Sequence, residues 1–299
     1  TKDVDMNTNL RRGRPRVVST IAVLALTLGA AGGAIAAPAS AHDGVDHGAE
    51  AGSEAALDWS NYEKITLTKD TGEPIDMAVM ADGKVLTTAR NGDIRLTDPD
   101  AGTTKVINTV PVYTNSEDGM QTISLDPDFE TNKWVYLYYA PRTMTAPYVT
   151  TTPTGSAPTT LPAGQDASYW DQWKGYNQLT RVKWDDAAGK LDLSTEQVIL
   201  KVEQQRGQCC HVAGDVDFDA DGNLYLATGD NTPASAPGAN GYAPNNDAPG
   251  LNPGMDSRRG AGNTNDLRGK ILRITVQEDG SYTIPAGNLF APGTAQTRP

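Results

Sequence analysis

The side chains best suited to chemistry stand together at Cys209-Cys210-His211. The cysteines are the only two of the 299-residue chain, and His211 is the only histidine after residue 58. Imidazole accepts a proton near neutral pH, so His211 is the natural general base if the protein abstracts a proton. It follows a polar stretch and precedes an expected strand, which places it at the mouth of a strand. A structural role for a lone histidine remains the alternative.

A carboxylate is expected close to this histidine. Asp230 belongs to Gly229-Asp230-Asn231, directly after the strand that follows His211. Loops at strand ends emerge at an edge of the sheet, where functional side chains collect. Asp230 is therefore predicted to lie near the same face as His211.

The two adjacent cysteines have two interpretations. Oxidation is expected in an exported protein, and Cys209 and Cys210 would then form a vicinal disulfide. Two unpaired buried thiols are the alternative. The pattern is not a haem attachment motif, and the sequence contains no second ligand cluster that would make a zinc site.

An acidic run resembles a calcium loop. Asp215, Asp217, Asp219 and Asp221 alternate before Gly222, but an EF-hand beginning at Asp217 would have Thr228 at its twelfth position. The run also lies between two strands. We therefore interpret Asp221-Gly222 as a hairpin turn.

Short strands and turns must position these residues. Three hairpins are predicted from period-two alternation around turn residues. They are 77–87 around Asp82-Gly83, 216–226 around Asp221-Gly222, and 123–138 around 128–133. Outer strands are expected at 179–184, with a turn at 185–189, and at 270–274, before Asp279-Gly280.

Repeated hairpins predict an all-β fold of the β-propeller kind, with a β-sandwich as runner-up. Two long loops, 141–176 and 231–266, interrupt the repeats and would shape a site. The first contains the aromatic cluster Tyr169-Trp170-Asp171-Gln172-Trp173, for which packing is favoured over sugar stacking.

The N-terminal region indicates export. Residues 1–41 are predicted to be a signal peptide, with a basic segment, an uncharged run at 17–37 and cleavage after Ala41. No stable membrane insertion is expected after cleavage. Residues 42–57 are predicted to be a disordered leader, and the formal charge of −12 argues against nucleic-acid binding.

Several motifs in this order resemble the glucose/sorbosone dehydrogenases over 58–299. They are Glu117-Asp118-Gly119-Met120, Leu125–Phe129, Val135-Tyr136, His211, Phe218–Tyr225, Gly229-Asp230 and Arg268–Ile274. That family is similar in fold to the soluble quinoprotein glucose dehydrogenases, six-bladed propellers that bind pyrroloquinoline quinone (PQQ) and calcium. The resemblance implies an exported sugar dehydrogenase with an unknown electron acceptor.

The resemblance also implies roles for individual residues. His211 matches the base that removes the proton of a sugar hydroxyl, and Asp230 matches an aspartate that contacts the sugar. Asp118 falls where the glucose enzymes carry a substrate-binding glutamine, and Cys210 where they carry an aspartate. By analogy with larger quinoprotein alcohol dehydrogenases, a Cys209–Cys210 disulfide would lie against the quinone. The resemblance assigns no calcium ligands in this chain.

Family members continue beyond Pro299 into further cofactor- and calcium-binding loops. The chain is therefore expected to supply about half of the propeller and, alone, to be inactive. Two other functions stay open: a non-catalytic secreted propeller that binds glycan or protein, and a metal-dependent propeller lactonase.

Overall fold

The computed structural model describes residues 59–207, 210–232, 249–256 and 258–289. The chain divides into two compact units, Thr1–Tyr62 and Glu63–Pro299. In the first unit, the description begins with a short 3₁₀ helix, η1 (Trp59–Asn61). The predicted signal peptide and leader lie outside the described residues, and both stay predictions.

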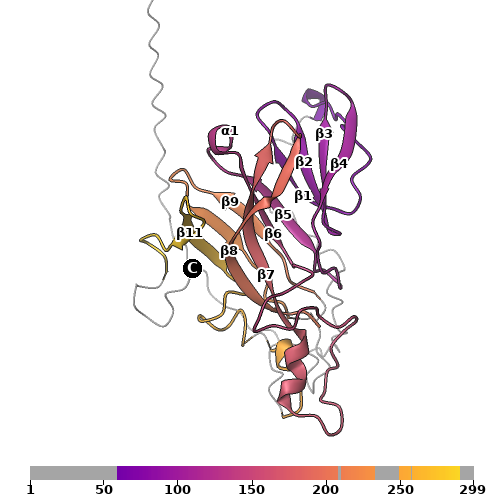
Figure 1. Cartoon of the computed structure of the whole chain (residues 1–299), viewed down its shortest axis with the longest axis vertical. Coiled ribbons are helices and arrows are strands. Elements are labelled where there is room, and N and C mark those ends of the chain that lie inside the picture. The colour runs from indigo at the N-terminus through magenta and orange to yellow at the C-terminus, as the bar shows by residue number, and fades with distance from the viewer. Residues whose placement is uncertain (1–58, 208–209, 233–248, 257, 290–299) are drawn as a thin grey trace, which may run out of the picture. The chain divides into compact units, whose positions relative to one another are not determined.

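The described part of the second unit consists of three four-stranded antiparallel sheets (Figure 1). In each sheet the strands follow one another in chain order. The first sheet contains β1 (Pro74–Val79), β2 (Val85–Ala89), β3 (Asp93–Asp98) and β4 (Thr103–Thr109). The second contains β5 (Met120–Leu125), β6 (Trp134–Tyr139), β7 (Lys174–Asp185) and β8 (Lys190–Gln205). The third contains β9 (Asp215–Phe218), β10 (Leu224–Ala227), β11 (Ile271–Val276) and β12 (Tyr282–Thr283).

Local turn chemistry forms the predicted hairpins. Val79 pairs with Val85 across the Asp82-Gly83 turn, and Phe218 pairs with Leu224 across Asp221-Gly222. Both turn glycines have positive φ angles, +84° and +78°, which glycine adopts without steric cost. The hairpins at β5–β6, β7–β8 and β11–β12 are present as well.

Asp219 organises the turn in the acidic run. Its carboxylate accepts hydrogen bonds from the backbone N–H groups of Asp221 and Asn223, at 3.0 and 2.9 Å, and from the Asn223 side chain. These donors, that of the Asn223 side chain first, lower the pKa of Asp219 to about 2. The hairpin interpretation of this run is confirmed.

The three sheets stack face to face, with the middle sheet packed on both sides. One core of buried residues joins the β1–β4 and β5–β8 sheets, and it includes Leu86, Ile94 and Ile123. A second core joins β5–β8 to the third sheet and includes Tyr138, Leu179 and Leu226.

The first strands of neighbouring sheets lie against each other, β1 beside β5 and β5 beside β9. The Asp76 carboxylate of β1 accepts hydrogen bonds from the Thr122 hydroxyl and from the Ile123 N–H of β5. Such sheets, with their first strands side by side, have the arrangement of propeller blades. A two-layer sandwich does not describe them.

The first long loop ends in the 3₁₀ helix η2 (Ala167–Trp173), which precedes β7. Trp170 and Trp173 are buried in a small cluster with Ala157. The packing role predicted for this aromatic segment is confirmed.

The helices of the described residues are short. They include α1 (Phe129–Asn132), in the turn between β5 and β6, and the 3₁₀ helix η4 (Pro253–Met255). None of the helices in the described ranges has the length and hydrophobicity needed to cross a membrane.

Candidate active site

The segment that carries His211 has an unusual backbone. Cys210, His211 and Ala213 have φ angles of +79°, +60° and +38°, in the left-handed region that L-residues seldom adopt. Such conformations persist only where the surroundings enforce them, and they cluster at functional sites. The strained segment stands directly before β9.

The end of β10 enforces this conformation from one side. The Asn231 N–H donates to the His211 carbonyl at 2.8 Å, and the Gly229 N–H donates to the Val212 carbonyl at 3.2 Å. A Cβ atom at Gly229 would lie 1.9 Å from the His211 oxygen. Only glycine at residue 229 therefore permits this close approach of the two chains.

The His211 imidazole lies beside the Asp230 carboxylate. Nδ1 of His211 is 3.3 Å from Oδ1 of Asp230, and the two side chains are 44% and 31% exposed. A carboxylate at this position favours the tautomer with its proton on Nδ1, which leaves Nε2 free to accept one. The structure thus brings together two residues that the sequence analysis selected.

The Arg268–Ile274 motif also contacts the segment that carries Asp230. The Gly269 N–H donates to the Gly229 carbonyl at 2.8 Å. A Cβ at Gly269 would lie 3.3 Å from the Asp230 Cβ, and one at Gly260 would lie 3.1 Å from the Asp230 carbonyl oxygen. Glycines thus let this loop close over the backbone of Asp230.

Glu117 is the site residue that the sequence analysis missed. Its carboxylate Oε2 accepts a hydrogen bond of 2.5 Å from the backbone N–H of His211. The Glu117 carbonyl accepts a 2.8 Å bond from the Gln121 side chain, which ties the Glu117 turn to β5. The sequence motif contains two adjacent acids, Glu117 and Asp118, and only the fold shows that Glu117 is the one that bonds to His211.

Asp118, the neighbouring acid, is 1% exposed, and its Oδ1 has no hydrogen-bond partner among the described residues. Burial raises the pKa of Asp118 to about 7, although the buried Arg206 guanidinium opposes this shift. Arg206 itself donates to the carbonyls of Pro141 and Tyr176 at 2.9 and 2.6 Å. The structure therefore places Asp118 in the interior, whereas the substrate-binding role remains a prediction.

Cys210 is disulfide-bonded. Cys209, the only other cysteine of the sequence, lies outside the described residues. The vicinal disulfide and its contact with a quinone stay predictions.

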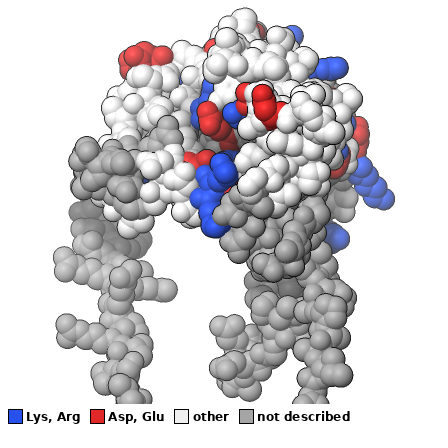
Figure 2. Space-filling view, turned by 90° about the horizontal axis from the view of Figure 1, so that it is seen from below, with Lys and Arg blue, Asp and Glu red and all other residues white. Residues whose placement is uncertain are grey.

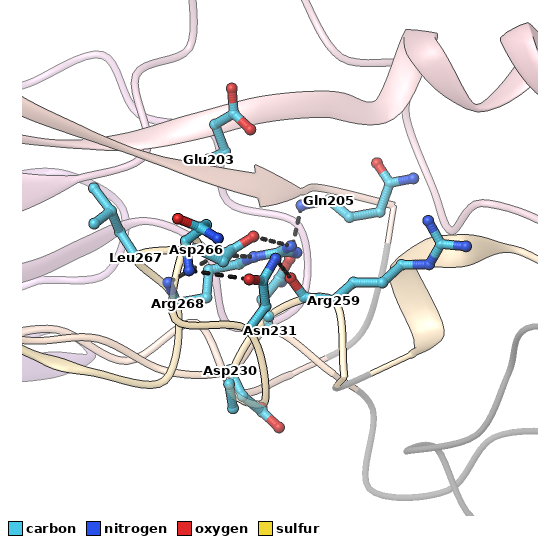
Figure 3. A network of polar contacts seen from close by, with 12 residues as sticks. Glu203, Gln205, Asp230, Asn231, Arg259, Asp266, Leu267 and Arg268 are labelled. Atoms are coloured by element: carbon cyan, nitrogen blue, oxygen red, sulfur yellow. Dashed lines mark hydrogen bonds and ion pairs between the residues drawn. The ribbon is translucent and has the colours of Figure 1, made fainter. Parts of the chain in front are cut away.

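A polar network at the end of β8 contains Asn231 (Figure 3), whose backbone N–H also donates to the His211 carbonyl. The Asn231 side chain accepts a 2.7 Å hydrogen bond from the Gln205 N–H through Oδ1. Nearby, Arg268 makes two side-chain bonds to Asp266, at 2.9 and 2.7 Å. Figure 3 shows that the Asp230 side chain points away from this network, on the other side of the Asn231 backbone.

Comparison with known proteins gives this geometry its context. The family described as glucose/sorbosone dehydrogenase matches residues 71–298. The chain belongs to the glucose/sorbosone dehydrogenase family. The resemblance drawn from the motifs is thereby confirmed.

Solved structures of glucose dehydrogenases share the fold. One matches with a TM-score of 0.52 and 21% identity over 78% of this chain and 52% of its own length. A second matches with a TM-score of 0.51 and 21% identity, over 77% and 55%. A third, the PQQ-bound aldose sugar dehydrogenase from Streptomyces coelicolor, has a TM-score of 0.46 and 21% identity, over 77% and 51%. The chain spans about half the length of these enzymes.

The residues around His211 can be compared with what a quinone cofactor would require. PQQ carries three carboxylates, for which cationic partners are expected. The polar partners of His211 in the described part of the chain are two carboxylates and a backbone amide. This arrangement suits a proton acceptor. It does not fit the carboxylates of the quinone, so the residues around His211 are not assigned to quinone binding.

Calcium ligands are not identified either. Within the described ranges, no group of three or more His, Cys, Asp or Glu residues could hold a metal ion.

Proposed function

We propose that this chain is the part of an exported sugar dehydrogenase that holds the general base. Family membership supports the reaction class, and the His211–Asp230 contact of 3.3 Å carries the assignment of the base. The substrate class is a sugar of the aldose or sorbosone type. The proposed function involves neither nucleic-acid binding nor insertion into a membrane.

The reaction is the two-electron oxidation of a sugar hydroxyl to a carbonyl. Nε2 of His211 accepts the hydroxyl proton while the C–H bond breaks, and the hydride leaves to an acceptor. The sequence resemblance implies that the full-length protein would use pyrroloquinoline quinone as this acceptor, and the residues around His211 are not assigned to hold it. A positioned base contributes about 10²–10⁴-fold to such a step.

Asp230 has a defined part in this mechanism. Its carboxylate beside Nδ1 holds the imidazole in the productive tautomer and stabilises the imidazolium that forms on proton transfer. Both side chains are partly exposed, so a sugar can reach them. In the full-length protein, the remaining blades would supply the rest of the cofactor site.

The proposal is tested with the full-length protein, purified after expression with its N-terminal region and reconstituted with PQQ and calcium. Oxidation of a panel of aldoses and sorbosone is followed with an artificial electron acceptor. Quinone-dependent turnover of at least one sugar is the expected result. If quinone binds but no sugar is oxidised, the dehydrogenase proposal fails and a glycan- or protein-binding propeller takes its place.

A further inference from the structure

The long loop between β6 and β7 carries no charged side chain over most of its length. Residues 143–164 contain no Asp, Glu, Lys or Arg, although 21% of the chain is charged, and their only polar side chains carry hydroxyl groups. Figure 1 shows this loop at the lower end of the drawing, beside η2. Figure 2, which is seen from below, shows broad uncharged surface around a central group of acidic and basic side chains. Water therefore contacts this loop through hydroxyl groups and backbone.

Hydroxyl side chains are concentrated around Pro153. Five of the seven residues 150–156 are Thr or Ser, and further prolines stand at 147 and 158. Segments rich in Ser, Thr and Pro are typical of O-glycosylated regions. Proline also holds the residue before it in an extended conformation, and residues 142–159 contain neither helix nor strand. Such a segment is accessible to an enzyme that binds an extended peptide.

The fold separates accessible hydroxyl groups from an inaccessible one. Thr150, Thr151, Thr154 and Ser156 are exposed. Thr152, which stands among them, is 9% exposed, and its Oγ1 is buried. The structure thus presents four hydroxyl groups of this segment to solvent and buries the fifth, a distinction that the sequence does not contain.

Backbone contacts anchor the loop on both sides of the exposed hydroxyl groups. The Met144 N–H donates to the Thr150 carbonyl at 2.7 Å, and the Ala157 N–H donates to the Gly207 carbonyl at 2.8 Å. Met144 and Ala157 are both buried. Because these anchors lie apart from the exposed side chains, a bulky group on the hydroxyl oxygens would extend into solvent and leave the anchors intact.

Other exposed hydroxyl groups of the domain are held by carboxylates. Ser168 donates to Asp166 and Ser194 donates to Asp192, both at 2.6 Å. Residues 143–164 offer no carboxylate for a contact of this local kind. Their exposed hydroxyl oxygens can therefore act as acceptors in a transfer reaction without first breaking such a bond.

We propose that Thr150, Thr151, Thr154 and Ser156 are O-glycosylated in the exported protein. Each hydroxyl oxygen bonds to the anomeric carbon of an activated sugar phosphate, the bond from that carbon to the phosphate oxygen breaks, and the proton passes to a base of the transferase. The sequence contains no Asn-X-Ser/Thr triplet, so attachment through asparagine is not open to it. The attached sugars hydrate the uncharged loop. The inference rests on the export that is part of the function proposed above.

Mass spectrometry tests the modification on the full-length protein, purified from the culture medium of the organism that encodes it. Its intact mass should exceed that of a polypeptide with the same N-terminus by whole sugar residues. Trypsin releases 143–174 as one peptide, because no Lys or Arg lies between Arg142 and Lys174. We expect the sugar on this peptide, and fragmentation by electron transfer should place it on the four exposed residues and not on Thr152.

A variant without the four hydroxyl groups is compared with a matched control. Thr150→Val, Thr151→Val, Thr154→Val and Ser156→Ala together should remove at least half of the mass excess. Thr66→Val, at an exposed threonine of a segment that also lacks helix and strand but has no proline nearby, should retain all of it.

Failure of this inference can be told apart from failure of the dehydrogenase proposal. A protein with the mass of its polypeptide, sugar confined to other peptides or to Thr152, or a smaller loss in the fourfold variant refutes the modification whatever the oxidation assay shows. If the sugar is found as expected but the reconstituted protein oxidises no substrate, the modification stands and only the dehydrogenase proposal falls.

Discussion

His211 is held in place through three different atoms. Its N–H bonds to Glu117, its carbonyl accepts from Asn231, and its Nδ1 lies beside Asp230. Glu117 precedes β5, whereas Asp230 and Asn231 both follow β10, so two strand ends fix the His211 backbone and Asp230 orients its imidazole. Fixing a base in this way is what proton transfer at a defined atom requires.

Glu117 should therefore act as a positioning residue. We expect Glu117→Ala to lower kcat at least tenfold, about 1.4 kcal/mol in the barrier, because His211 loses the acceptor that fixes its backbone. KM for the sugar should change little. Glu117→Gln keeps a carbonyl oxygen as acceptor and should recover most of kcat. Steady-state kinetics of the full-length protein measure both constants.

Glu130→Ala, at an exposed acid of α1, is the control for this series. A Glu117→Ala variant with kcat within twofold of wild type would show that the bond to His211 has no mechanistic role.

Asp118 should make stability depend on pH. Its pKa is 3.8 in an unfolded chain and about 7 in the fold, because burial disfavours the charged form. The folded state thus holds a proton that the unfolded state releases above pH ~4, and the free energy of unfolding falls between pH ~4 and ~7 by up to a few kcal/mol. Below pH ~4, Asp118 is protonated in both the folded and the unfolded state, so it does not change the free energy of unfolding with pH.

Asp118→Asn removes this titration. Relative to wild type, the Tm of the variant should rise progressively from pH 4 to pH 7 in thermal scans. Asp100→Asn, at an exposed turn, should leave the wild-type pH profile unchanged. Parallel profiles of wild type and Asp118→Asn would contradict the ionisation of a buried carboxyl.

At the scale of elements, the contact between β10 and the His211 segment depends on Gly229. An alanine there would place its Cβ 1.9 Å from a backbone oxygen, which cannot move away as a flexible side chain could. We expect Gly229→Ala to cost about 1–3 kcal/mol in the free energy of unfolding and to displace His211. Urea unfolding and kcat are the measurements.

Gly83→Ala separates the steric effect from the backbone effect. Gly83 has a φ of +84° with no atom within 4 Å of an added Cβ, so its substitution costs only the strain of the left-handed backbone. It should leave kcat unchanged, whereas Gly229→Ala should reduce it. Equal kcat in the two variants would mean that the close approach at Gly229 does not position the base.

The sequence predicted the elements best where the signal was local. The Asp82-Gly83 and Asp221-Gly222 hairpins follow from turn chemistry within a few residues, and both are present. The strands β3 and β4 were missed. In β3, the polar residues Arg95 and Thr97 are buried, so the strand lacks the alternation of polar exposed and apolar buried residues that predicts a strand. In β4, few side chains are strongly apolar.

Site residues, too, could be predicted only where the signal in the sequence was local. His211 and Asp230 could be selected because one is the only histidine of the folded region and the other follows a predicted strand. The Glu117 contact joins residues 94 positions apart, and adjacent acids differ only in the direction that a turn gives them. No local pattern distinguishes Glu117 from Asp118. Only the fold shows that Glu117 bonds to His211 and that Asp118 is buried.

On the scale of the whole molecule, the described residues provide three sheets of a propeller-like fold and the contact between His211 and Asp230. The chain spans 52% and 55% of the two glucose dehydrogenase structures with the same fold. The six-bladed ring, the quinone and calcium ligands and export therefore belong to the proposal for the full-length protein.

The central claim is that His211 is the base, and His211→Ala in the full-length protein tests it most directly. Turnover is measured with PQQ and calcium on a sugar that wild type oxidises, and quinone binding is followed separately by its absorbance. We predict at least a hundredfold loss of turnover with quinone still bound, since His211 is the only histidine after residue 58 of this chain. Turnover within a few-fold of wild type would contradict the account and make His211 a structural residue.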